Sequence, residues 1–130
     1  MQFTLPGVPC IYYGDEVGMQ GYRDPFNRAS FPWEGGNTEL LGYYRHLAAI
    51  RGELDCFADG EMHIIFAEDG SMVYTRTGEK TAVLVALCSR GQLSFDLPEN
   101  FRSGECVIGN VSGERIELGA NECAMIVLRS

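Results

Sequence analysis

The first half of the chain combines one continuous apolar run with one stretch of helical periodicity. Residues 8–13 are uninterruptedly apolar, which is typical of a strand buried on both faces, as in a parallel sheet. Residues 15–33 are rich in glycine, proline and polar side chains and predict a long loop. Apolar residues then recur at helical spacing over 39–53, after a cap at Asn37 or Thr38. This half therefore predicts a strand, a loop and an amphipathic helix.

The second half is a series of short β-rich runs separated by turn residues. Glycine, asparagine, proline and serine recur between the runs, as expected for antiparallel strands. The predicted strands are 62–67, 72–77, 81–88, 92–97, 106–108, 115–118 and 123–128. We therefore predict a mostly β protein, in which a strand–loop–helix unit (1–55) precedes an antiparallel β-sandwich (56–130).

Charge and composition narrow the classes of partner. The net charge is −8, and only one of the ten basic residues is lysine. A phosphate backbone would be repelled, so we expect no nucleic-acid binding. No apolar run approaches the ~20 residues of a membrane span, and the start, MQFTLPGVP, lacks the basic region of a signal peptide. We expect no membrane partner.

The five cysteines are odd in number, and no two are spaced as a CxxC motif. Cys10, Cys88 and Cys123 fall within apolar runs, which favours buried free thiols. Free thiols are typical of a reducing compartment, so the composition predicts a cytoplasmic protein.

One stretch of the first half carries a specific resemblance. LPGVPCIYYGDEVG is followed by a D-P-x-x-R segment, here Asp24, Pro25 and Arg28, and then by FPW at 31–33. Together these segments closely resemble the α-amylase family of glycoside hydrolases (family 13), above all its neopullulanase, cyclomaltodextrinase and α-glucosidase members. The family pattern G-x-P-x-I-Y-Y-G-D/E-E is matched at Gly7, Pro9, Ile11, Tyr12, Tyr13, Gly14, Asp15 and Glu16.

The resemblance implies a domain organisation. In this family the first motif forms the eighth strand of a (β/α)8 catalytic barrel, and an all-β C-terminal domain follows the eighth helix. Residues 1–55 would then be the last, incomplete β/α unit of the barrel, and residues 56–130 the C-terminal sandwich. The chain would be the final part of a larger enzyme, with the missing catalytic barrel as its structural partner.

The resemblance also implies a reaction and a substrate class. Family members cleave or transfer α-glucosidic bonds with retention, in maltooligosaccharides, cyclodextrins or pullulan, using two carboxyl groups ~5 Å apart. The resemblance places these two carboxylates, together with a second aspartate that stabilises the transition state, at the ends of the fourth, fifth and seventh barrel strands. None of those strands is in this sequence, so no catalytic residue is assigned here and we expect the chain alone to be inactive. Asp15 and Glu16, adjacent in an extended segment, would point in opposite directions. We expect them at the structural rim of the active site, with Glu16 the better candidate for a buried ion pair.

The loop supplies the candidate substrate-binding residues. In the resembling enzymes it contacts sugar, and Asp24 can accept from sugar hydroxyls while Arg28 donates with its planar fork. The alternative is that Asp24 and Arg28 only form a local ion pair around Pro25. Tyr22 is a further substrate-binding candidate and Trp33 a rim residue; such aromatics stack on sugars or, more often, pack the loop onto the barrel.

No cofactor or metal is expected. His46 and His63 have no cysteine, histidine or aspartate neighbour at the spacing of a metal site. Two other classes of function stay open. The chain could be a stand-alone carbohydrate-binding β-domain, or a module that forms a homo-oligomer by pairing residues 3–13 with a second copy.

Overall fold

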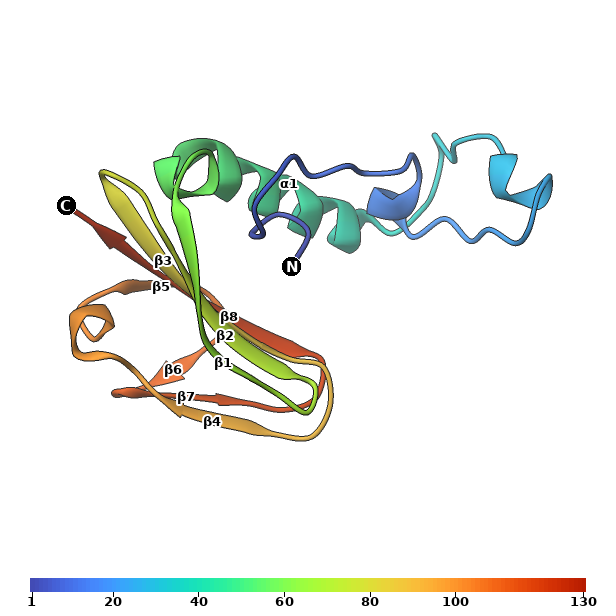
Figure 1. Ribbon diagram of the computed structural model, residues 1–130. Helices are drawn as coiled ribbons and strands as arrows, with labels where there is room; N and C mark the ends of the chain where they lie inside the picture. Colours follow the sequence, from blue (N-terminus) through green and yellow to red (C-terminus); the bar gives the residue numbers. More distant parts are fainter. The chain divides into compact units, whose positions relative to one another are not determined.

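The computed structural model describes residues 1–130 and divides them into two compact units. The first unit comprises Met1–Phe3 and Gly7–Glu53, and the second comprises Thr4–Pro6 and Leu54–Ser130. The chain therefore enters the second unit for a few residues near its N-terminus before returning to the first. Colours in Figure 1 follow the sequence and locate these segments.

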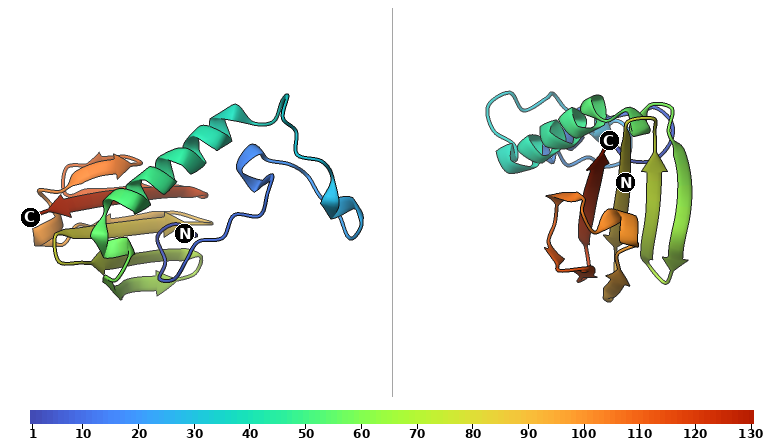
Figure 2. Two further views of the ribbon diagram at one scale, coloured as in Figure 1. Left: turned by 90° about the horizontal axis from the view of Figure 1, so that it is seen from above. Right: turned by 90° about the vertical axis from the view of Figure 1, so that its left-hand side faces the viewer.

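The first unit is built on one long helix, α1 (Thr38–Glu53), close to the predicted range. The side-chain oxygen of Asn37 accepts from the N–H of Leu40 at 2.8 Å, so Asn37 is the helix cap. Short 3-10 turns, η1 (Asp15–Val17) and η2 (Phe26–Arg28), interrupt the predicted loop. Figure 2 shows the loop as an extended excursion before the helix.

The strand predicted at residues 8–13 is not formed, and this prediction was wrong. A parallel strand needs neighbours for its backbone hydrogen bonds, and no strand of the structure pairs with this segment. Instead, Arg51 of α1 donates to the carbonyls of Phe3 and Gly7 at 2.6 and 2.5 Å. The apolar run is consequently left open: Val8 is 94% exposed.

The second unit contains two antiparallel sheets, and it confirms the predicted series of antiparallel strands. The larger sheet has the order β1-β2-β3-β8-β5 and the smaller the order β4-β7-β6. The strands are β1 (Glu61–Glu68), β2 (Ser71–Thr77), β3 (Thr81–Cys88), β4 (Leu93–Asp96), β5 (Glu105–Ile108), β6 (Val111–Ser112), β7 (Arg115–Leu118) and β8 (Glu122–Arg129). Two further 3-10 turns are η3 (Asp55–Phe57) and η4 (Glu99–Phe101). Figures 1 and 2 show the smaller sheet as a second layer beside the larger one.

Turn chemistry explains the first hairpin. Glu68 pairs with Ser71, so the connection between β1 and β2 is the two-residue turn Asp69-Gly70. Asp69 has φ 43° and Gly70 has φ 89°. Positive φ at both central positions defines the turn whose twist matches antiparallel strands, and aspartate followed by glycine is a preferred pair for it.

Side chains from both sheets share one apolar core. Period-two alternation sends Leu93, Ile116 and Leu118 of the smaller sheet inward against Val73 and Leu84 of the larger one. The remaining buried members are Ala86, Cys88, Leu97, Phe101, Ala124 and Ile126. Because these side chains point into the core, the residues that alternate with them on β4 and β7 face solvent.

A buried polar cluster lies on β2, at positions that alternate with the core residue Val73. The hydroxyls of Tyr74 and Thr4 are 2.6 Å apart. Arg76 is 1% exposed and donates to the carbonyls of Thr4 and Gly60 at 3.1 and 2.9 Å. Its Nε has no partner, and its guanidinium lies 5.9 Å from the ring centroid of Phe57. Thr4 is therefore held in the second unit by hydrogen bonds, and the two residues after it belong to the same compact unit.

Asp55 ties η3 to the turn between β2 and β3. Its carboxylate accepts from the hydroxyl of Thr81 and, at 2.9 Å, from the N–H of Lys80. These two hydrogen bonds, the Thr81 bond first, lower the pKa of Asp55 below its ordinary range. The fold therefore stabilises the ionised form of Asp55.

All five cysteines are free thiols. Cys56 and Cys88 are buried, and burial raises the pKa of the Cys56 thiol. Of the three thiols predicted to be buried, Cys88 is buried, Cys123 is half-buried and Cys10 is exposed, because residues 8–13 form no strand packed on both faces. No helix has the length and apolar character needed to cross a membrane.

Candidate functional site

The loop brings Asp24 and Arg28 together. The carboxylate of Asp24 and the Nε of Arg28 form an ion pair of 2.9 Å around η2. Backbone hydrogen bonds from Phe26 to Arg23 and from Arg28 to Pro25 shape the turn, at 3.0 and 3.1 Å. The local ion pair weighed from the sequence is thus present. Both side chains are more than half exposed, so the pair also presents donors and acceptors to solvent.

Two aromatic side chains of the loop are largely exposed to solvent. Tyr22 is 82% exposed and Trp33 87% exposed. Phe31 and Trp33 make a tilted ring contact with centroids 4.9 Å apart. Two open aromatic faces and one polar pair are therefore carried on a single segment of residues 22–33.

Asp15 and Glu16 adopt a geometry different from the predicted extended one. They lie in the 3-10 turn η1, because Gly14 has φ 94° and reverses the chain just before them. The carboxylate of Glu16 accepts from the N–H of Gly14 at 2.8 Å instead of binding an arginine, and Asp15 is exposed. They do not form a facing carboxylate pair.

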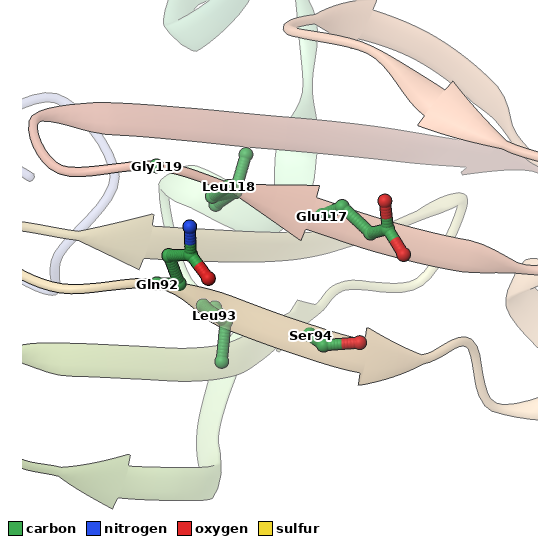
Figure 3. A pocket seen from close by; sticks show the side chains of 6 residues that line it. All are labelled: Gln92, Leu93, Ser94, Glu117, Leu118 and Gly119. Atoms are coloured by element: carbon green, nitrogen blue, oxygen red, sulfur yellow. The ribbon is translucent and has the colours of Figure 1, made fainter.

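A hollow of about 300 Å³ on the second unit was not predicted from the sequence. Figure 3 shows the side chains around it, on adjoining parts of β4 and β7. They are Gln92, Leu93, Ser94, Glu117, Leu118 and Gly119. Alternation of polar Gln92, Ser94 and Glu117 with apolar leucines was the available signal, but the pairing of these distant strands was needed to join them.

A second hollow, of about 400 Å³, is lined mainly by acidic residues and glycines. Asp55 is among them and is already engaged by Thr81 and Lys80. No group of three or more histidine, cysteine or acidic side chains is arranged to hold a metal ion. His46 and His63 are both exposed.

Several known enzymes are similar to this chain in sequence and in structure. No family model matches it. It is 34% identical, over 88% of its length, to a cyclomaltodextrinase of Geobacillus thermopakistaniensis, and covers 20% of that enzyme. It is 31% identical, over 92% of its length, to a maltogenic α-amylase of Bacillus acidopullulyticus, and covers 23% of it. The structure of an Arthrobacter globiformis cyclic α-maltosyl-(1→6)-maltose hydrolase, in complex with that sugar, superposes with a TM-score of 0.79 at 25% identity, over 98% of this chain and 28% of the hydrolase.

The fold, mostly antiparallel β-sheets with one N-terminal helix, thus matches part of the structures of an α-amylase and of a related hydrolase. The chain is homologous, over most of its length, to the C-terminal region of enzymes of the α-amylase family, glycoside hydrolase family 13. It spans only 10–23% of the length of the first curated relatives that it matches.

Proposed function

We propose that this chain is the C-terminal part of an enzyme that hydrolyses or transfers α-glucosidic bonds, and that its loop of residues 22–33 binds the glucan. The observation that carries the proposal is the homology to α-glucan hydrolases over most of the chain. The substrates are maltooligosaccharides, cyclodextrins or pullulan. The partner is the catalytic barrel that holds the reacting carboxylates.

The chemistry of the loop supports sugar binding. A carboxylate accepts from hydroxyls, and a guanidinium donates to others in a fixed plane. Asp24 and Arg28 offer both functions side by side, already held by their mutual ion pair. Tyr22 and Trp33 add exposed rings, and aromatic rings provide a flat apolar surface together with a polar edge.

The same geometry disfavours catalysis by the chain alone. Retaining glycosidases need two carboxyl groups ~5 Å apart on opposite sides of the scissile bond. Glu16 is engaged with the backbone of Gly14, and Asp24 with Arg28. We therefore expect no release of reducing sugar from maltoheptaose or cyclodextrin by this chain. Release that disappears in Glu16→Gln would overturn this part of the proposal.

A graft tests the whole proposal. The matched C-terminal region of the Geobacillus cyclomaltodextrinase is replaced by this chain, and cyclodextrin hydrolysis is measured. The double variant Asp24→Ala/Arg28→Ala should lower kcat/KM by about tenfold or more, the effect of losing at least one charge-assisted hydrogen bond. The matched control is Arg102→Ala/Glu114→Ala, which removes another exposed ion pair between an arginine and a carboxylate, of 3.0 Å.

The two variants separate a binding role from general surface charge. The control should keep kcat/KM within about twofold of the unmodified graft, since exposed ion pairs contribute little. Equal losses in both variants, or no loss in either, would contradict the assignment of the loop. Circular dichroism identifies any graft that has failed to fold.

A second candidate is self-association through residues 8–13. Phe3 and Thr4 are buried within the chain, so the exposed part of the predicted 3–13 contact begins at Pro6, and its first exposed large apolar side chain is Val8. This stretch carries no charge that would keep two copies apart. Light scattering should then report a dimer for the native chain and a monomer for Val8→Ser/Ile11→Ser, whereas a monomeric native chain excludes this candidate.

A further inference from the structure

The hollow on the smaller sheet brings together three polar side chains from distant parts of the sequence. Ser94 of β4 and Glu117 of β7 are direct cross-strand partners in the antiparallel register. Both are exposed, because their neighbours Leu93 and Leu118 point into the core. Gln92, just before β4, completes the group, as Figure 3 shows.

These three side chains are not tied down by the fold, although the charge of Glu117 acts on Arg115, two residues before it on β7. Gln92, Ser94 and Glu117 make no side-chain hydrogen bond or ion pair with the rest of the protein. The next outward pair on the same two strands behaves differently: Asp96 and Arg115 form an ion pair of 2.6 Å. On the outer face of the sheet, the ion pair of Asp96 and Arg115 therefore lies next to a group of polar side chains without hydrogen-bond partners.

The chemistry of the open group restricts its ligand. One carboxylate is too few for a divalent cation, which takes several oxygen ligands. An anion would be repelled by Glu117 and by a chain of net charge −8. A purely apolar ligand would strip water from three polar groups without replacing their hydrogen bonds. An amide, a hydroxyl and a carboxylate together suit a neutral ligand with several hydroxyls, since they supply both donors and acceptors.

The size of the hollow fits a short part of a longer ligand. At about 300 Å³ it lies at the lower end of the range of small-molecule sites. Gly119 closes one side without a side chain, and its N–H is held by Glu122 at 2.7 Å. A hollow of this size takes only a short part of a glucan and leaves the rest of the polysaccharide in solvent.

We propose that Gln92, Ser94 and Glu117 form an accessory α-glucan subsite on the β-sheet unit, separate in the sequence from the loop of residues 22–33. The class of ligand rests on the function proposed above, because the glucan is inferred from homology to α-glucan hydrolases. The subsite itself rests on the hollow and its uncommitted polar groups. Its role is to hold a second stretch of the polysaccharide.

The test is a titration of the full, isotope-labelled chain with maltoheptaose, followed by two-dimensional NMR. Backbone signals of residues 92–94 and 117–119 should shift and saturate. Gln92→Ala and Glu117→Gln should each weaken the affinity at these signals by about fivefold or more, the effect of losing one hydrogen bond. Glu99→Gln is the matched control, since it also removes one negative charge from an exposed side chain of the same unit without breaking an ion pair, and it should change the affinity by less than about twofold.

The outcomes separate this subsite from the proposed function of the loop. Shifts confined to residues 22–33 overturn the subsite and support the loop, whereas shifts confined to the hollow support the subsite and contradict the loop. A folded protein without shifts in either place overturns both. Shifts in the hollow with spermidine but not with maltoheptaose also overturn the subsite, because the hollow would then select cations.

Discussion

The hydrogen bond between Tyr74 and Thr4 allows a test of whether residues 4–6 are an integral part of the second unit. Tyr74 is fully buried, and burial raises the pKa of its hydroxyl. Its oxygen lies 2.6 Å from that of Thr4. If residues 4–6 belong to the second unit, breaking this bond from either side must destabilise that unit.

The magnitudes follow from the burial of both groups. Thr4→Val leaves the Tyr74 hydroxyl buried without this partner, and Tyr74→Phe removes the same bond from the other side. Each variant should lower the free energy of unfolding by about 1–3 kcal/mol. The double variant replaces both hydroxyls by apolar groups, so it should cost less than the two single changes together, by about 1–2 kcal/mol.

Urea unfolding followed by circular dichroism measures these values. Tyr13→Phe is the control, because its hydroxyl donates to the carbonyl of Ala29 at 3.1 Å on the exposed surface of the first unit. It should change the free energy of unfolding by less than about 0.5 kcal/mol. Additivity of Thr4→Val and Tyr74→Phe within about 0.3 kcal/mol would refute the reasoning, since uncoupled residues add.

Three further predictions concern the backbone, pH and thiol reactivity. In urea unfolding, Gly109→Ala should destabilise the protein by about 3 kcal/mol or more, and Gly113→Ala by about 1 kcal/mol. Both glycines have positive φ, but a Cβ at Gly109 would lie 2.3 Å from a backbone oxygen, whereas a Cβ at Gly113 would contact nothing. The hydrogen bonds that lower the pKa of Asp55 favour its ionised form, so the stability that they add is present at neutral pH and lost on acidification below about pH 4. Asp55→Asn should therefore lower the melting temperature at pH 7, and it should reduce the fall in melting temperature between pH 5 and about pH 3. Iodoacetamide followed by mass spectrometry should modify Cys10 rapidly and Cys56 only on unfolding, and equal rates for the two would contradict their exposures.

Local pattern was sufficient to predict most of the β-sheet unit. The predicted strands at 81–88 and 115–118 coincide with β3 and β7, since turn residues bound them closely. The strand β6, only two residues long, was missed because so short a run shows no periodicity. Strand propensity at residues 8–13 was misleading, because a strand depends on neighbouring strands that the local sequence does not describe.

The candidate functional residues also divide into those that the local sequence predicts and those that depend on the fold. The ion pair of Asp24 and Arg28 follows from residues four apart, which a local turn can bring together. The extended geometry predicted for Glu16 was wrong, because Gly14, with its positive φ, reverses the chain and residues 15–17 form a 3-10 turn. The hollow at Ser94 and Glu117 depends on the register of two strands separated by more than twenty residues in the sequence, and period-two alternation alone does not give that register.

The central claim is that the loop of residues 22–33 binds α-glucan, and the fluorescence of Trp33 tests it most directly. Trp33 is the only tryptophan of the chain and is 87% exposed, so its emission reports on this loop alone. Titration with maltoheptaose should change the emission in a saturable way, and Asp24→Ala should weaken the apparent affinity by about tenfold. Emission that stays constant throughout the titration, or an affinity that Asp24→Ala leaves unchanged, would contradict the account.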